Sequence, residues 1–164
     1  MTRKILSLKD PNWHTSRGRI IYDPARPGMK RRTKYWAIVN VDREITRYFR
    51  WWVDRELLNI TGVEGFGLCQ PSWDAHISII RGENDVRKMP KELLRELWGK
   101  YQGKEVSFRY SLNVRKETNK GLVSDRPGDY WFVDVDCPEL VDIRKEMGLP
   151  CNWKLHLTVG RTYY

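Results

Sequence analysis

The sequence predicts an α+β domain. Segments in which apolar and polar residues alternate, as in half-buried strands, are separated by segments with the spacing of amphipathic helices. A His-apolar-hydroxyl motif also occurs twice within apolar runs, at His76 in the first half of the chain and at His156 in the second. This repeat indicates two similar lobes, each with one such strand. No segment has the composition of a linker, so we expect residues 1–164 to form one bilobed domain.

The first part of the chain predicts two strands before the first His strand. Residues 1–34 are expected to be an irregular N-terminal extension, with a short strand at residues 19–22 and a basic loop after it. Residues 35–41 are rich in β-branched and aromatic residues and predict a strand. The first His strand is expected at residues 75–81, because apolar residues alternate there with His76 and Ser78.

A long helix is expected between these strands. Asp42 is a good N-cap, and apolar and aromatic residues follow at helical spacing to about residue 59. The stripe includes Tyr48, Phe49 and Trp52, and such a stripe is typical of a core face.

The second part of the chain predicts two helices and three strands. Pro90 suits the first turn of a helix over residues 91–101, and Pro138 suits the start of another that ends near residue 148. Alternation predicts strands at three places, residues 104–116, 130–136 and 154–161.

Composition indicates an anionic partner. The 164 residues contain 30 Lys and Arg against 21 Asp and Glu, a formal net charge of +9. This surplus of positive charge favours RNA, DNA, nucleotides or a membrane surface as the partner. The alternative is that the basic residues only keep the surface of the protein solvated. The eight Trp and eight Tyr suit core packing, and in a basic protein also stacking on bases.

The cysteines and the N-terminal segment indicate in which cellular compartment the protein is found. The three cysteines are widely spaced and lack a paired zinc spacing, which fits a reducing cytosol. We see no apolar segment long enough for a signal peptide or a membrane span. A cytoplasmic protein with no membrane partner is expected, and no protein partner is identified by the sequence.

The two motifs together predict acid–base chemistry. Side chains alternate along a strand, so each histidine shares a face with the hydroxyl two residues later, Ser78 or Thr158. Imidazoles titrate near neutral pH and can act as general base and general acid. The hydroxyls suit the nonbridging oxygens of a phosphate. Nearby acidic residues form no obvious metal-binding motif, and Asp74, Asp134 and Asp136 could at best orient a histidine by accepting its second N–H.

The motifs His76-Ile77-Ser78 and His156-Leu157-Thr158 resemble those of the two-histidine (2H) phosphoesterase superfamily. Its members include LigT-like RNA cyclic phosphodiesterases and phage enzymes that cleave cyclic-nucleotide defence signals. The resemblance implies that His76 and His156 are catalytic, that Ser78 and Thr158 bind phosphate, and that no metal or other cofactor is needed. It also implies a pseudo-symmetric bilobed fold in which two β-sheets line a cleft and helices pack outside. Ser78 stands where the family more often has threonine.

Two arginines are further candidates for phosphate binding. Arg81 and Arg161 each lie five positions after a motif histidine, so a regular strand would turn them away from the cleft. Gly160 could let the second strand bend and return Arg161 to the phosphate, and Gly82 could do the same more weakly for Arg81.

Five aromatic residues are candidates for base stacking, with core packing as the alternative for each: Trp73, Tyr22, Trp36, Tyr110 and Trp131.

The sequence therefore predicts a metal-independent phosphodiesterase acting on a cyclic nucleotide or cyclic oligonucleotide. Within the superfamily, compact size, basic charge and abundant aromatics favour a phage enzyme that degrades cyclic-nucleotide immune signals in the host cytoplasm. A LigT-like RNA 2′,3′-cyclic phosphodiesterase is the first alternative. A non-catalytic module that binds nucleic acid or nucleotides is the second.

Overall fold

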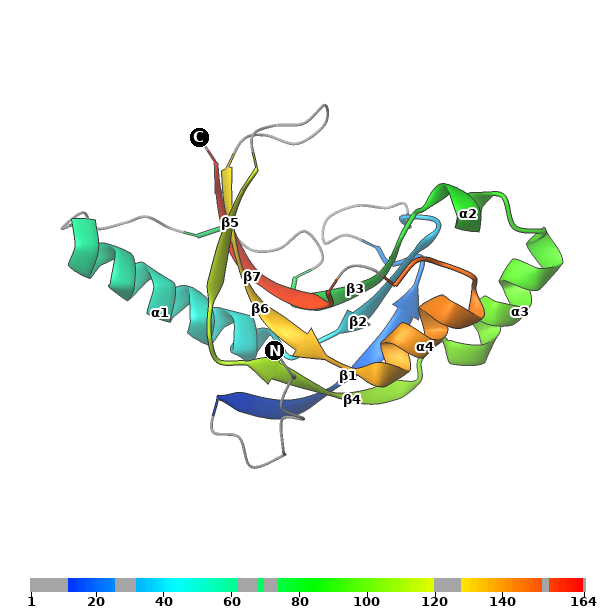
Figure 1. Ribbon diagram of the computed structural model, residues 1–164, viewed down its shortest axis with the longest axis horizontal. Coiled ribbons are helices and arrows are strands. Elements are labelled where there is room, and N and C mark those ends of the chain that lie inside the picture. Colours follow the sequence, from blue (N-terminus) through cyan, green and yellow to red (C-terminus); the bar gives the residue numbers. More distant parts are fainter. Residues whose placement is uncertain are drawn as a thin grey trace, which may run out of the picture.

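The computed structural model describes residues 12–25, 32–61, 68–69, 74–119, 128–151 and 154–163. It confirms the α+β class, with both helices and antiparallel strands (Figure 1). The elements are, in chain order, β1 (Trp13–Tyr22), β2 (Trp36–Asn40), α1 (Arg43–Thr61), β3 (His76–Arg81), α2 (Asn84–Arg87), α3 (Lys91–Tyr101), β4 (Glu105–Ser111), β5 (Arg115–Asn119), β6 (Gly128–Asp136), α4 (Pro138–Glu146) and β7 (His156–Tyr163).

The strands form one continuous antiparallel sheet. Their order is β4-β1-β2-β3-β7-β6-β5, and β4 also pairs with β6, which closes the sheet into a barrel. The two separate sheets that the family resemblance implied are therefore joined, because the two His strands β3 and β7 pair with each other at the centre.

The repeat indicated by the two motifs is present in the topology of this sheet. An antiparallel pair, β1 and β2, precedes α1 and the His strand β3. Another antiparallel pair, β5 and β6, precedes α4 and the His strand β7. The two halves meet where β3 lies beside β7, so the His strands are neighbours in space although they are far apart in the chain.

The helices pack across the boundary between the halves. Helix α1, from the first half, contacts β7, and α4, from the second half, contacts β3. Figure 1 shows α1 extending to the left of the sheet and α3 and α4 lying to the right. Between sheet and helices lies a core of fully or nearly fully buried side chains, which includes Ile77, Leu140 and Leu157.

Helix α1 begins as expected but buries less of its aromatic stripe. The Oδ1 atom of Asp42 accepts the Glu44 N–H at 3.0 Å, which caps the helix. Phe49 is buried in the core, whereas Tyr48 is 56% exposed and Trp52 is 41% exposed. The prediction that the whole stripe faces the core is therefore wrong for these two residues. The apolar face of α1 extends further around the helix than the part that packs against the core.

Residues 13–22 correct the expectation of an irregular N-terminal extension. They form the ten-residue strand β1, which pairs with β2 on one side and β4 on the other. Gly18 explains part of the weak sequence signal, since a Cβ there would lie 2.5 Å from both the Asn40 oxygen and a Val39 methyl carbon. A glycine inside a strand usually lowers the signal for a strand, and here it marks a close approach to β2.

The helices expected at residues 91–101 and from Pro138 are confirmed as α3 and α4. No helix in the described part of the chain is long and apolar enough to cross a membrane.

Candidate active site

The two His motifs meet across the central pair of strands. Ile77 of β3 pairs with Leu157 of β7, and both side chains are fully buried on the helix side of the sheet. In an antiparallel pair the residues flanking such a pair oppose each other and point to the other face. On that face, which we call the cleft face, the histidine of each motif opposes the hydroxyl residue of the other, His76 with Thr158 and Ser78 with His156.

Both imidazoles are oriented by main-chain carbonyls. The Nδ1 atom of His76 lies 3.0 Å from the Asp74 carbonyl oxygen, and that of His156 lies 3.3 Å from the Lys154 carbonyl oxygen. A carbonyl oxygen can only accept a hydrogen bond, so Nδ1 carries the hydrogen in both rings. The Nε2 atoms are therefore the nitrogens available for chemistry. The carbonyls orient the rings, not the carboxylates of Asp74, Asp134 or Asp136 that the sequence had suggested.

Arg81 lies against the second imidazole. Its Nη2 atom is 3.3 Å from Nε2 of His156. Because a guanidinium only donates hydrogen bonds, Nε2 is the acceptor and the imidazole of His156 is neutral in this arrangement. Burial and then the charge of Arg81 lower the pKa of His156. Burial is also the main cause that lowers the pKa of His76, and the charges of His156 and Arg81 add to it.

Two β-bulges overturn the argument that placed both arginines away from the cleft. In the β2–β3 pair, Ala37 opposes Ile80 but Ile38 opposes Ser78, which leaves Ile79 as an extra residue in β3. A bulge shifts the alternation of side chains by one. Arg81 therefore returns to the cleft face, where it contacts His156.

A β-bulge also occurs in β7. Trp131 opposes Gly160 but Phe132 opposes Thr158, so Val159 is the extra residue. Each bulge thus lies three residues after its motif histidine. Arg161 opposes Tyr130, donates a hydrogen bond from Nη2 to the Tyr130 hydroxyl at 2.7 Å, and shares the cleft face with Thr158.

Each bulge is bound by an arginine from the helix of the other half. Arg144 of α4 donates from Nη1 to the Ile79 carbonyl at 2.9 Å, and Arg50 of α1 donates from Nη1 to the Val159 carbonyl at 3.1 Å. A bulge disrupts the ladder locally, so these guanidiniums satisfy carbonyls at the disrupted positions. Sequence reasoning missed both residues, since nothing local marks a helical arginine as the partner of a strand far along the chain.

Arg144 also joins α4 to the end of β3. It is 3% exposed and donates to the Glu83 carboxylate at 2.5 Å. Glu83 in turn accepts the main-chain N–H of Arg81 at 2.8 Å. Burial acts to raise the pKa of Glu83, but the hydrogen bonds from Arg144 and the main chain outweigh it, so the pKa is lowered and the carboxylate stays charged.

A comparison with protein-family models identifies a family. The model "2H-SAK: Swiss Army Knife, 2H phosphoesterase domain" matches residues 63–164, a segment that contains both His strands. The chain belongs to this family. No curated protein and no solved structure matches it. Membership indicates phosphodiesterase-type hydrolase activity and an anionic substrate that contains phosphate.

Other side chains of this 2H domain form the wall beside His156. Phe132 of β6 has its ring centroid 5.3 Å from that of His156. Arg115 lies over the Phe132 ring at 5.3 Å and forms an ion pair with Asp134 at 3.0 Å. Tyr130, Phe132 and Asp134 share one face of β6, because residues two apart in a strand point the same way. In the register with β7 they oppose Arg161, Thr158 and His156, so this is the cleft face. No local signal in β6 decides which of its faces this is.

Of the four stacking candidates that the structure describes, Trp36 lies beside the motif strand β3, where it opposes Arg81. In this register it shares the face of Arg81. Tyr22 is 3% exposed and packs on Trp98 with ring centroids 4.4 Å apart, so it is not accessible to a base. Trp131 is 8% exposed because it points to the helix side of β6.

Tyr110 pairs with Val135 and contacts Phe49 of α1, which places it on the helix side as well. Trp73 lies outside the described residues. Within the described ranges, no group of three or more His, Cys, Asp or Glu side chains lies close enough together to hold a metal ion.

Proposed function

We propose that this 2H domain is a metal-independent phosphodiesterase that hydrolyses cyclic nucleotides or cyclic oligonucleotides, with His156 as general base and His76 as general acid. One observation carries the proposal: each motif histidine opposes the hydroxyl residue of the other motif on one face of β3 and β7. Two Nε2 atoms and two hydroxyls on one face are the groups that an in-line displacement at phosphorus requires.

The contacts of the two imidazoles support these roles. His156 is neutral, with its Nε2 lone pair directed at a cation, so it can take a proton from an attacking water. The water oxygen then forms a bond to phosphorus while the bond from phosphorus to a ribose oxygen breaks. His76, protonated at Nε2, gives its proton to that leaving oxygen. The substrate's negative charge favours the imidazolium form that this step needs.

The phosphate would be bound by groups beside the imidazoles. The hydroxyls of Ser78 and Thr158 can donate to its nonbridging oxygens, and the guanidiniums of Arg81 and Arg161 supply positive charge on the same face. Arg81 contacts His156 in this structure, and a bound phosphate would compete for the same guanidinium.

A substrate panel in excess chelator tests the proposal. The panel contains 2′,3′-cyclic mononucleotides, RNA ending in a 2′,3′-cyclic phosphate, and 3′,3′- and 2′,3′-linked cyclic dinucleotides. We expect turnover of a cyclic dinucleotide, as for an enzyme that degrades cyclic-nucleotide immune signals. Turnover confined to 2′,3′-cyclic phosphates would instead support the LigT-like reaction, the first alternative.

Histidine variants test the mechanism. His76→Ala and His156→Ala should each lower turnover by roughly 10²–10⁴-fold, the usual effect of removing a general acid or base. His14→Ala is the matched control, since His14 is exposed and stacks on Tyr110 away from β3 and β7. Loss of activity on chelation, or full turnover in either motif variant, would contradict the mechanism. Binding of RNA that survives both variants, without any product, would support a non-catalytic module.

A further inference from the structure

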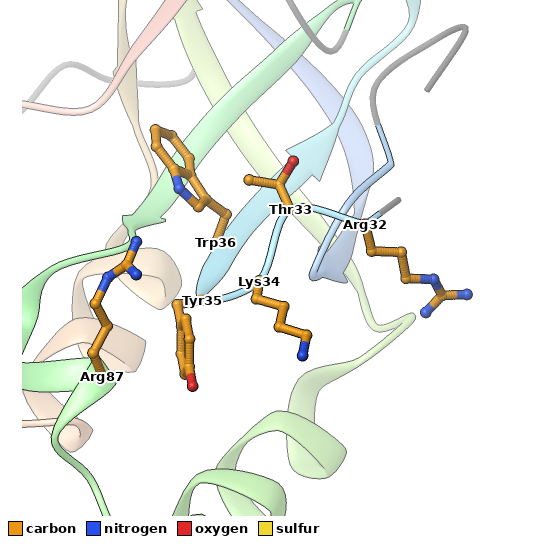
Figure 2. A pocket seen from close by; sticks show the side chains of 6 residues that line it. All are labelled: Arg32, Thr33, Lys34, Tyr35, Trp36 and Arg87. Atoms are coloured by element: carbon orange, nitrogen blue, oxygen red, sulfur yellow. The ribbon is translucent and has the colours of Figure 1, made fainter. Parts of the chain in front are cut away.

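A cavity of about 660 Å³ opens beside the end of β3, outside the motif residues. Among the described residues, its lining combines three cationic side chains with two aromatic rings and a hydroxyl, with no acidic side chain: Arg32, Thr33, Lys34, Tyr35, Trp36 and Arg87. In Figure 2 the two rings and the Arg87 guanidinium lie at one side, and the side chains of Lys34 and Arg32 extend at the other. Aromatic faces with nearby cations are the recurring means of binding a base together with its phosphate.

Glycine at position 82 leaves room for two of the side chains that line the cavity. Gly82 has φ +64, and a Cβ at this position would lie 2.9 Å from Nε1 of Trp36 and 3.1 Å from an Nη atom of Arg87. Arg87 is held in place by a hydrogen bond from Nε to the Gly82 carbonyl at 2.9 Å, and lies over the Tyr35 ring at 5.2 Å. A side chain on residue 82 would therefore collide with two of the lining residues.

Tyr35 adopts a conformation that a bulky residue rarely takes. Its φ is +67, in the left-handed region. The surrounding structure holds it there, since its N–H donates to Asp23 at 2.8 Å and its carbonyl accepts the Gly82 N–H at 3.0 Å. Strain of this kind persists where neighbouring contacts determine it, and it often occurs at ligand sites.

The cavity adjoins the cleft face at Trp36 and Arg81. Trp36 opposes Arg81 across β2 and β3, and Arg81 contacts Nε2 of His156. Residues directly opposed in neighbouring strands have their Cβ atoms only about 5 Å apart. A ligand whose phosphate meets Arg81 therefore has the Trp36 ring beside it and the cations of the cavity just beyond.

We propose that this cavity binds a second nucleotide of the substrate, with its base on Trp36 and its negatively charged backbone among the cations of the cavity, which include Lys34 and Arg87. The inference rests on the proposed function for the identity of the ligand, and it adds a substrate class: an oligonucleotide or cyclic oligonucleotide with a phosphate beyond the scissile one. A mononucleotide fills the cleft face alone.

Binding to a catalytically inactive protein tests this independently of turnover. Calorimetric titration of the His156→Ala protein would compare an RNA trinucleotide 3′-phosphate with the matching mononucleoside 3′-phosphate. We expect the trinucleotide to bind at least about tenfold more tightly, the gain from one base–aromatic stack. Trp36→Leu, added to this protein, should weaken trinucleotide binding by about tenfold and mononucleotide binding by much less.

Two exposed cations keep the test informative if the Trp36 variant does not fold. Lys34→Gln and Arg87→Gln should each selectively weaken the trinucleotide, since both side chains are exposed and line the cavity. Arg95→Gln is the matched control: it removes the same charge from an exposed position on α3, outside the cavity. It should leave the trinucleotide preference intact.

The outcomes separate this inference from the proposed function. Equal affinity for the two ligands, or equal losses in the cavity variants and in Arg95→Gln, would overturn the second nucleotide site even if the wild-type protein hydrolyses phosphodiesters. A selective loss in the cavity variants would support the site even if no member of the substrate panel is hydrolysed.

Discussion

The two histidines have the same orientation but different surroundings. Both donate from Nδ1 to a main-chain carbonyl two residues earlier, so both present Nε2 to the cleft face. His156 has a cation at hydrogen-bond distance from its Nε2 atom, the Nη2 atom of Arg81 at 3.3 Å. His76 is more deeply buried, at 9% exposure. This difference is the physical basis for assigning the base role to His156 and the acid role to His76.

The pH dependence of kcat/KM should reflect the lowered pKa values of His76 and His156. Activity should rise with pH as His156 loses its proton, and fall as His76 loses its proton. Burial lowers the pKa of both free imidazoles below their ordinary value of about 6.5, so we expect the maximum of kcat/KM below about pH 6.5. The profile of kcat should lie at higher pH, because the bound phosphate favours imidazolium.

Arg81→Gln provides the check on this profile. Removing the cation beside His156 should raise the pKa of that imidazole and move the acid limb of kcat/KM to higher pH. An acid limb that stays in place, or a wild-type maximum above pH 8, would contradict the assignment.

At the scale of elements, the crossed helix–strand contacts explain how the arginines reach the cleft face. Each His strand contains one bulge, and each bulge carbonyl accepts a hydrogen bond from a helix of the other half. Arg50 and Arg144 are therefore positioning residues, since they hold the backbone that directs Arg161 and Arg81. The Arg50 side chain is half-buried, and this burial lowers its pKa.

Arg50→Met should impair phosphate binding more than folding. Loss of its bond to the Val159 carbonyl should lower the free energy of unfolding by about 1 kcal/mol. With the bulge released, Arg161 should be less well held, so KM should rise severalfold with a smaller fall in kcat, as in Arg161→Gln. Arg47→Met, an exposed position one turn earlier on α1, is the control. An unchanged KM in Arg50→Met alongside a raised KM in Arg161→Gln would show that the bulge holds without Arg50.

Glycine substitutions should have opposite effects at two positions. A Cβ on Gly160 would lie 2.9 Å from the Leu68 Cβ and 3.2 Å from the Arg50 Cγ, so Gly160→Ala should destabilise the fold by about 1–3 kcal/mol. A Cβ on Gly99 in α3 meets nothing within 4 Å, so Gly99→Ala should stabilise by about 0.5–1 kcal/mol. Urea denaturation measures both, and shifts of the same sign would be inconsistent with this packing.

At the scale of the whole molecule, the fold extends beyond the segment that the family model matches. That segment, residues 63–164, excludes β1, β2 and all of α1. Yet β2 pairs with the His strand β3, and β1 joins β2 to β4. The barrel is closed only when these two strands are present.

Deleting residues 1–24 tests whether β1 is integral. Its loss would leave β2 and β4 without their shared neighbour and open the sheet, so we expect loss of cooperative thermal unfolding and of activity. Deleting residues 1–11, which leaves β1 intact, is the control. If the shorter protein without β1 unfolded cooperatively and kept its activity, residues 13–22 would be an accessory strand.

The sequence by itself determined the family, the α+β class and the sharing of a face by each histidine and its hydroxyl. These depend on local patterns, since residues two apart in a strand point the same way whatever surrounds them. The tertiary structure decided the rest. Whether Arg81 and Arg161 reach the cleft face depends on bulges at Ile79 and Val159. A bulge exists only relative to the register of a partner strand, and no segment of one strand specifies that register.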